Sequence, residues 1–251
     1  MGFAVTADAY DRFMGRFSRP LAAVFADMAG VDGGAVLDVG CGPGALTDEL
    51  VRRGARVRAV DPAPGFVEAV RARHPGVDVL EASAEALPFP DGAFDAALAQ
   101  LVVHFMAEPA AGLAEMVRVT RRGGTVAACV WDHALGPLSV FWQAVASLHE
   151  GDGPPPGEAS RAGQHRGDLE RLLLGAGLVE VEEAPIATVV RFEDVASWWA
   201  PFELGVGPAG DHVSGLDAQG RALLAARCRE LLPPAPFDVT ATAWSARGIR
   251  H

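Results

Sequence analysis

Short strand-like runs, rich in apolar residues, alternate with helix-like segments through the first half of the chain. The strand-like runs cover residues 35–39, 56–61, 77–82, 94–100 and 125–131. The helix-like segments cover 45–54, 65–76 and 109–124, and each ends at glycine or at a Pro-Gly pair. This order predicts a Rossmann-like α/β fold, a doubly wound and mostly parallel sheet with right-handed crossovers.

The pattern changes after residue 131. Helix-like segments follow at 141–150, 166–177, 193–202 and 217–232, with a Pro/Gly-rich loop at 151–163. Residues 178–192 predict one long strand or two, and the alternating residues 237–248 predict a final antiparallel edge strand. We expect a single domain over 1–251. Its parts are a core over 1–131, helical cap insertions interleaved with a core strand over 132–236, and the edge strand over 237–251.

Composition narrows the function. Half of the 251 residues are hydrophobic, enough for a sizeable core. The net charge of −11 argues against binding to nucleic acid or to an anionic membrane. The chain contains no lysine, which excludes Schiff-base catalysis and a P-loop lysine.

The cysteines and the N-terminus bear on location. Cys41, Cys129 and Cys228 form no CxxC pair and suit a reducing compartment. The first residues carry acids where a signal peptide needs an apolar centre, and no apolar run reaches membrane-spanning length. We expect a cytoplasmic protein without a membrane span.

The stretch "VLDVGCGPG" carries the candidate chemistry. Gly40, Gly42 and Gly44 follow a strand and open a helix, but their spacing is not the Gly-x-Gly-x-x-Gly of dinucleotide sites. Asp38 would repel a pyrophosphate placed at that helix. It would attract S-adenosylmethionine (SAM), which carries an ammonium and a sulfonium group and no phosphate. The loop therefore favours SAM over a nicotinamide dinucleotide.

Asp61 ends the second predicted strand, about 20 residues beyond the first glycine. An acid at this place can accept hydrogen bonds from both ribose hydroxyls of a nucleoside. The alternative is an N-cap for the helix that follows.

These motifs resemble those of the class I SAM-dependent methyltransferases. "VLDVGCGPG" is similar to motif I and "VRAVDPAP" to the second motif. "ASAEALPFPDGAFDAALAQLVVHF" resembles the stretch that holds adenine, and "MVRVTRRGGTVAACVWD" the helix and strand after it. The type-11 group, the small-molecule and quinone-biosynthesis-like branch, is the best match. The resemblance covers roughly residues 5–135 with specific motifs, and the rest more loosely.

The resemblance implies SAM-binding roles for individual residues. Asp38 precedes the loop, and the methionine part of SAM follows Gly40, Cys41, Gly42 and Gly44. The nucleoside part meets Asp61 at the ribose, Pro62 beside the adenine, and Ser83, Ala84 and Glu85 at the adenine edge. Gln100 and Leu101 end the fourth strand near the sulfonium. Ser83 departs from the family, in which an acid often accepts from the adenine amino group; a serine hydroxyl can also accept.

The leading stretch "AYDRFMGRFSRPLA" is similar to the family's lid helix over the cofactor. Tyr10 and Arg16 are candidate contacts to the methionine carboxylate, Arg16 as a bidentate donor. The alternative is a solvated amphipathic helix whose Phe13 and Phe17 pack on the core.

Methyl transfer from a sulfonium is an in-line displacement, so the protein mainly positions the partners and excludes water. An oxygen or nitrogen acceptor also calls for proton removal. His104 and His133 follow the fourth and fifth strands and are the candidate bases near neutral pH. Alternatively, both only cap or pack. No cluster has metal-ligand spacing, and we expect no metal.

Aromatic residues of the second half either pack the cap or line an apolar acceptor pocket. They are Trp131, Phe141, Trp142, Trp198, Trp199 and Phe202. The sequence thus predicts a methyltransferase that uses SAM, releases S-adenosylhomocysteine (SAH), and methylates O, N or C of a small, apolar or aromatic metabolite. The alternatives are a SAM-binding protein without methyl transfer and, disfavoured by the loop, an NAD-dependent oxidoreductase. The sequence leaves open whether the chain is a monomer or a homodimer.

Overall fold

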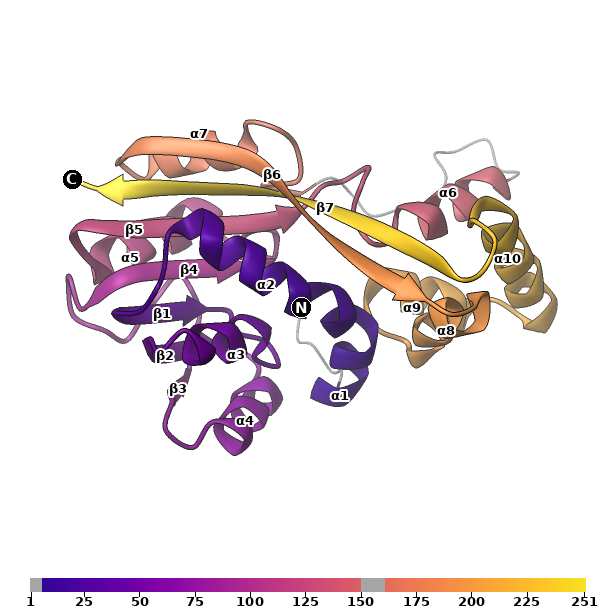
Figure 1. Ribbon diagram of the computed structural model, residues 1–251, viewed down its shortest axis with the longest axis horizontal. Helices are drawn as coiled ribbons and strands as arrows, with labels where there is room; N and C mark the ends of the chain where they lie inside the picture. The colour runs from indigo at the N-terminus through magenta and orange to yellow at the C-terminus, as the bar shows by residue number, and fades with distance from the viewer. Residues whose placement is uncertain (1–5, 150–160) are drawn as a thin grey trace.

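A computed structural model describes residues 6–149 and 161–251. Its centre is a seven-stranded sheet in the order β3-β2-β1-β4-β5-β7-β6 (Figure 1). The strands are β1 (Ala35–Val39), β2 (Arg56–Asp61), β3 (Asp78–Glu81), β4 (Phe94–Gln100), β5 (Thr120–Trp131), β6 (Leu178–Phe192) and β7 (Phe237–Arg250). The first five run parallel, and β7 is antiparallel to both β5 and β6. The doubly wound, mostly parallel fold is confirmed.

The final strand is antiparallel as expected, but it does not lie at the edge. β7 lies between β5 and β6, and β6 is the edge strand. Residues 243–247 and Ile249 of β7 pair with both neighbours, whereas residues 237–242 pair with β6 alone. The polar alternation of this stretch therefore reflects a half-exposed ribbon, seen in Figure 1 as the long β6–β7 arm, and not an edge position.

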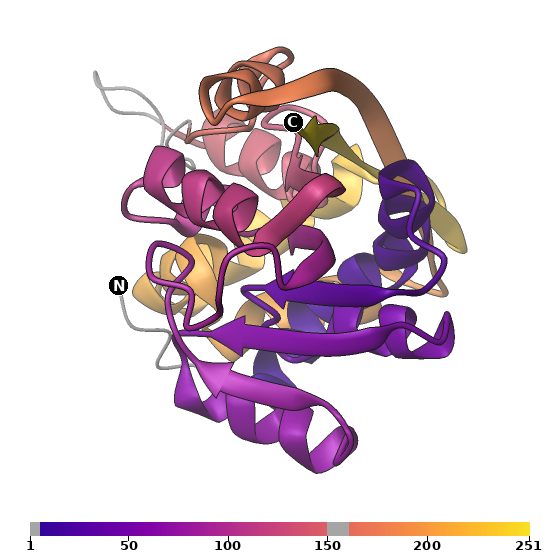
Figure 2. The same ribbon diagram turned by 90° about the vertical axis from the view of Figure 1, so that its left-hand side faces the viewer.

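Helices cover both faces of the sheet. They are α1 (Ala7–Tyr10), α2 (Arg16–Ala29), α3 (Ala45–Arg52), α4 (Pro64–Arg73), α5 (Pro109–Val119), α6 (Ser139–Ser147), α7 (Asp168–Gly175), α8 (Val195–Trp199), α9 (Gly207–Gly215) and α10 (Ala218–Leu231). A π-helical turn, η1 (Asp11–Gly15), joins α1 to α2. Buried side chains place α2 and α3 on one face and α5 and α7 on the other (Figure 2).

Several boundaries differ from the sequence expectations. The helix expected over 109–124 ends at Val119, because the residues after it extend β5, with Thr120 pairing with Phe94. Residues 178–192 form one strand with a register shift between Val179 and Glu182. Helix α9 was missed, since its glycines and proline indicate a loop. Most of the expected loop at 151–163 lies outside the described residues.

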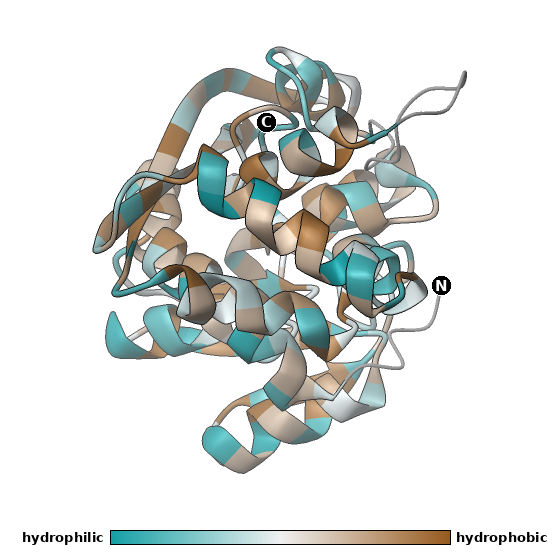
Figure 3. Cartoon of the chain, turned by 90° about the vertical axis from the view of Figure 1, so that its right-hand side faces the viewer, coloured by the Kyte–Doolittle hydropathy of each residue, from teal (hydrophilic) through white to brown (hydrophobic). Residues whose placement is uncertain are grey.

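The cap has its own apolar cluster. Helices α6, α8, α9 and α10 pack with the β6–β7 arm and with η1 and α2 of the leading segment. Seen from the cap end, the helices carry both hydrophilic and hydrophobic residues, as amphipathic helices do (Figure 3). The leading segment, residues 7–29, thus connects the sheet to the cap. Within the described ranges no helix is long and apolar enough to cross a bilayer.

Candidate cofactor and acceptor site

The glycine loop lies at the carboxyl end of β1, as expected. The backbone N–H groups of Gly40 and Cys41 donate to the Val60 carbonyl at 2.8 and 2.9 Å, which ties the loop to β2. Gly40 has φ +69°, and a Cβ there would lie 2.5 Å from the Val102 side chain. Gly42 has φ +52°, and a Cβ there would meet no atom within 4 Å. Gly40 is therefore needed for packing, whereas Gly42 borders open space.

Asp61 ends β2 directly beside this loop. Its Oδ2 accepts from the Gly42 N–H and its Oδ1 from the Ala63 N–H, both at 2.8 Å. A carboxylate has about four acceptor positions, so two remain for a ligand. Ala63, not Asp61, is the N-cap of α4, so the helix-cap alternative is wrong. Pro62 follows at the surface.

Asp38 lies beneath the loop, with 1% of its surface exposed. The Thr47 hydroxyl donates to its Oδ2 at 2.6 Å, and its Oδ1 has no hydrogen-bond partner among the described residues. Burial raises the pKa of Asp38 to about 7; the Asp61 charge adds to the rise and the Thr47 bond opposes it. Burial also raises the pKa of the Cys41 thiol well above its usual value.

The leading segment brings Tyr10 to the site but not Arg16. The Tyr10 ring packs edge-on against Phe66 at 5.5 Å, and burial, with the Asp61 charge, raises its pKa to about 12. The Arg16 Nη1 instead donates to the Ser197 carbonyl of the cap at 3.0 Å. The expected contact of Arg16 with the methionine carboxylate is therefore not supported.

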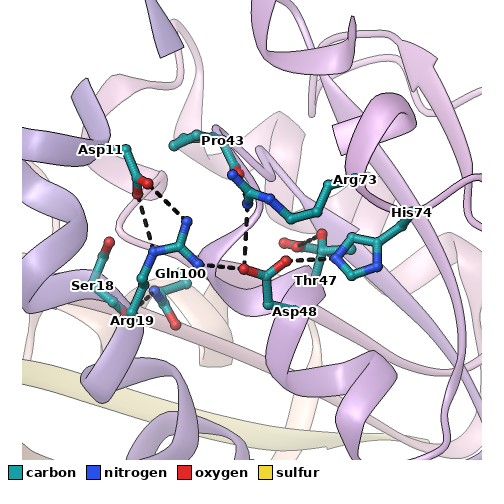
Figure 4. A network of polar contacts seen from close by, with 10 residues as sticks. Asp11, Ser18, Arg19, Pro43, Thr47, Asp48, Arg73, His74 and Gln100 are labelled. Carbon is teal, nitrogen blue, oxygen red and sulfur yellow. Dashed lines mark hydrogen bonds and ion pairs between the residues drawn. The ribbon is translucent and has the colours of Figure 1, made fainter. Parts of the chain in front are cut away.

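Arg19, which the sequence did not single out, holds the leading segment to the loop region (Figure 4). Its guanidinium donates to both oxygens of Asp11 at 3.2 and 2.9 Å and also pairs with Asp48 of α3. The sequence gives no signal for this role, because Arg19 belongs to no recognised motif and its partner Asp11 lies eight positions earlier.

Asp48 extends that network to α4 and the loop. His74 Nε2 lies 2.5 Å from Asp48 Oδ1, and Arg73 Nη1 lies 3.3 Å from Oδ2. Arg73 also donates to the Pro43 carbonyl of the glycine loop at 2.7 Å. The network therefore joins three helices and the loop around the predicted cofactor site.

The end of β4 carries two unusual features. Gln100 Nε2 donates to the Ser18 carbonyl of α2 at 2.9 Å, while its buried Oε1 has no partner among the described residues. Leu101 has φ +62°, a conformation that costs a non-glycine residue roughly 1–2 kcal/mol. Such local strain clusters at functional sites, which agrees with the expected position near the sulfonium.

The residues at the predicted adenine edge are hydrogen-bonded to one another. The Ser83 hydroxyl donates to Glu85 Oε2 at 2.5 Å. Glu85 Oε1 accepts from the Ala107 N–H at 2.8 Å and thereby fastens the loop near the start of α5. Ala84 is buried in the main apolar cluster.

The two candidate histidines differ in burial. His104 lies in a 3-10 turn after β4, its Nδ1 buried without a partner among the described residues. Burial, with the Arg161 charge, lowers the pKa of His104 to about 3, which does not support the expected titration near neutral pH. His133 is exposed, and its ring lies 5.5 Å from that of His165.

Most of the singled-out aromatic residues pack within the cap. Phe141 and Phe202 stack with ring centres 4.6 Å apart, and Trp198 lies 4.8 Å from Phe202. Trp131 ends β5 and lies 6.5 Å from Phe17 of α2. The buried Nε1 of Trp131 and that of Trp142 have no acceptor among the described residues. Phe141 also lies 6.4 Å from Trp199.

Comparison with known proteins shows which protein family the matched residues resemble. The type-11 family model, described as a methyltransferase domain, matches residues 37–128. The chain is 38% identical over 111 residues to malonyl-[acyl-carrier protein] O-methyltransferase of Serratia marcescens, covering 44% of each chain. It is 34% identical over 130 residues to demethylmenaquinone methyltransferase of Renibacterium salmoninarum, covering 51% of this chain and 55% of that protein. The chain thus spans about half the length of the curated relatives that it matches.

The solved structures agree in fold. A SAM-dependent methyltransferase of Thermotoga maritima, described as a possible histamine N-methyltransferase, superposes with a TM-score of 0.56 at 19% identity. The match covers 97% of this chain and 96% of that one. Motif, family model and fold together identify residues 37–128 as a methyltransferase domain of the class I, type-11 family.

Proposed function

We propose that the chain is a methyltransferase that moves the methyl group of SAM to an O, N or C atom of a small, apolar or aromatic metabolite. The proposal rests mainly on the position of Asp61 beside Gly42. The carboxylate fixes the loop through one N–H and keeps acceptor positions for ribose hydroxyls, while the space over Gly42 is open.

Within this proposal the leading segment closes over the cofactor. Tyr10 faces the Asp61 side, and Arg19 fastens the segment to Asp11 and Asp48. Closure excludes water from the sulfonium and positions the acceptor, which is the main demand of an in-line displacement. Residues 1–131 then form the SAM-binding core with its lid, and residues 132–236 supply the substrate cap.

The neutral state of His104 shapes the proposed chemistry. A base matched to neutral pH needs a pKa near the operating pH, and burial leaves the pKa of His104 at about 3. We infer that His104 acts on the acceptor by hydrogen bonding, and that positioning contributes more than proton abstraction by this residue. His133, exposed after β5, remains a candidate base only for an acceptor that reaches it.

We infer a cytoplasmic location, because Cys41, Cys129 and Cys228 are all free thiols.

The proposal is tested by binding followed by turnover. Calorimetry with SAM, SAH and NAD should give binding of the first two and none of NAD. Incubation with SAM and a panel of small acceptors should then release SAH together with a methylated product. SAH binding without any methylated product across the panel favours a SAM-binding protein without methyl transfer. Absence of SAM and SAH binding overturns the proposal.

A further inference from the structure

A small cavity lies between the leading segment and the cap. Apolar and aromatic side chains line it, together with one guanidinium; the lining includes Phe13, Arg16, Phe17, Leu138, Phe192 and Phe202. Neither Tyr10, Asp61 nor any glycine of the loop lines it. Its lining therefore differs from that of the predicted SAM site.

Arg16 is held in place by neutral groups. Its Nε donates to the Arg12 carbonyl at 3.2 Å, its Nη1 donates to the Ser197 carbonyl at 3.0 Å, and its guanidinium lies 5.1 Å above the Phe192 ring. Among residues 6–149 and 161–251, no carboxylate forms an ion pair with Arg16, and its Nη2 has no hydrogen-bond partner. Arg19, by contrast, pairs with Asp11 and Asp48.

A charge in apolar surroundings is costly when no opposite charge accompanies it. Arg16 is about half buried, and this partial burial lowers its pKa, in keeping with that cost. The two backbone carbonyls orient the planar guanidinium but do not neutralise it. One cation is balanced by one negative charge, and the flat fork of arginine matches a carboxylate. A phosphate dianion would leave net charge in the cavity.

The cavity also lies close to the predicted methyl-transfer position. Phe17 lines it and is 6.5 Å from Trp131 at the end of β5. The next residue, Ser18, accepts the hydrogen bond from Gln100, the residue expected near the sulfonium. Phe17 and Ser18 therefore connect the lining of the cavity to the ends of β4 and β5.

We propose that Arg16 and this cavity bind the carboxylate of an apolar or aromatic acid, which is the class of methyl acceptor used by this protein. The carboxylate is an anchor at the end of the acceptor away from the methylated atom. This inference rests on the proposed function. Since the cavity is small, this proposal requires the buried rings of Phe17 and Phe202, which line it, to move aside when the acid binds.

The test compares acids with neutral molecules of the same shape. Wild-type protein saturated with SAH is titrated calorimetrically with 2-naphthoate, indole-3-acetate and octanoate, and with the primary amide of each. We expect at least one acid to bind about 10- to 100-fold more tightly than its amide, the range for a hydrogen bond to a charged group. Arg16→Gln should remove the preference without changing SAH affinity.

The matched control is Arg12→Gln, one turn earlier on the same segment. Arg12 is exposed and pairs with Asp8, so its loss should leave the preference intact. Arg16→Lys, which keeps the charge without the fork, should retain part of the preference even if Arg16→Gln folds poorly. The inference is overturned if no acid binds better than its amide, or if either Arg16 variant keeps the full preference. Failure of SAH to bind the wild type would instead count against the proposed function.

Discussion

The Asp61 carboxylate at the end of β2 accepts a 2.8 Å hydrogen bond from the backbone N–H of Gly42, in the loop after β1. This contact makes the acid part of the loop's own structure as well as a candidate ligand for ribose. Asp61 is 6% exposed, so its acceptor positions face the protein and the site rather than bulk water. Binding and folding are therefore coupled at this residue.

Replacing Asp61 should consequently affect both properties. Asp61→Ala leaves the part-buried Gly42 and Ala63 N–H groups without their acceptor, which costs up to about 1–3 kcal/mol for each. It also removes the proposed ribose contact, so calorimetry should show SAH affinity falling at least tenfold. Asp61→Asn, which keeps one acceptor oxygen, should recover stability more than affinity. Unchanged SAH affinity in a folded Asp61→Ala variant would show that the nucleoside binds elsewhere.

Gly42→Ala should separate binding from folding. The new Cβ meets no protein atom within 4 Å, so its cost to stability is the positive φ alone, about 1–2 kcal/mol. Gly54→Ala is the matched control, because Gly54 also has positive φ and no neighbour within 4 Å. We expect similar melting temperatures for the two variants and loss of SAH binding only in Gly42→Ala. Equal SAH affinities would contradict the placement of the cofactor over Gly42.

Gly40→Ala should behave in the opposite way. Its Cβ would lie 2.5 Å from the Val102 side chain, so the loop and the turn after β4 cannot keep their present packing. We expect a lower melting temperature than for Gly42→Ala, measured without any ligand. If the two variants have the same melting temperature, Val102 adjusts easily and the close approach at Gly40 is not a structural requirement.

Gly15→Ala should loosen the leading segment. A Gly→Ala change in helical backbone normally stabilises by about 1 kcal/mol, but here the Cβ would lie 2.1 Å from Asp11 Oδ1. Asp11 must then leave Arg19. Gly65→Ala, in α4 with open space around it, is the control and should melt higher than wild type. Hydrogen exchange over residues 7–20 should accelerate in Gly15→Ala alone; unchanged exchange would show that the Asp11–Arg19 pair does not hold the segment.

Asp38 should make stability fall with rising pH. Burial raises its pKa from 3.8 to about 7 in the folded state, so between these values the unfolded chain ionises first and is favoured. The Asp38→Asn variant lacks this penalty. Relative to wild type it should gain about 2 kcal/mol in urea unfolding between pH 5.5 and 7.5, at roughly 1.4 kcal/mol per pH unit. If the free energy of unfolding depends on pH in the same way for the two proteins, Asp38 is ionised in the folded state throughout this range.

His104→Gln should keep most of the turnover. With a pKa of about 3 the imidazole is neutral across the working range, so its loss as a base matters little while glutamine retains hydrogen bonding. We expect turnover within about threefold of wild type, and a wild-type rate profile without a His104 step between pH 6 and 8. His133→Gln is the control. A fall of about 10²–10⁴ in His104→Gln would establish general-base catalysis and overturn our assignment.

The core of the fold was predictable from the sequence. The bounds of β1, β2 and β4 match the predicted strands. β1 and β4 are almost wholly apolar because both of their faces are buried, whereas exposed arginines alternate with buried residues at the start of β2. The positions of Gly40, Gly42, Gly44 and Asp61 followed from the same alternation, since the carboxyl ends of parallel strands share one edge of the sheet.

What each of those residues does was decided by tertiary contacts. Gly40 and Gly42 look alike in the sequence, yet only Gly40 is crowded, by Val102 from another loop. Arg16 and Arg19 are one turn apart on α2, but Arg16 meets the cap and Arg19 meets α3. The position of β7 inside the sheet depends on its pairing with β6, a strand that ends 45 residues earlier. A local pattern specifies strands, turns and charges, whereas burial, neighbours and pKa values depend on side chains that only the folded chain brings together.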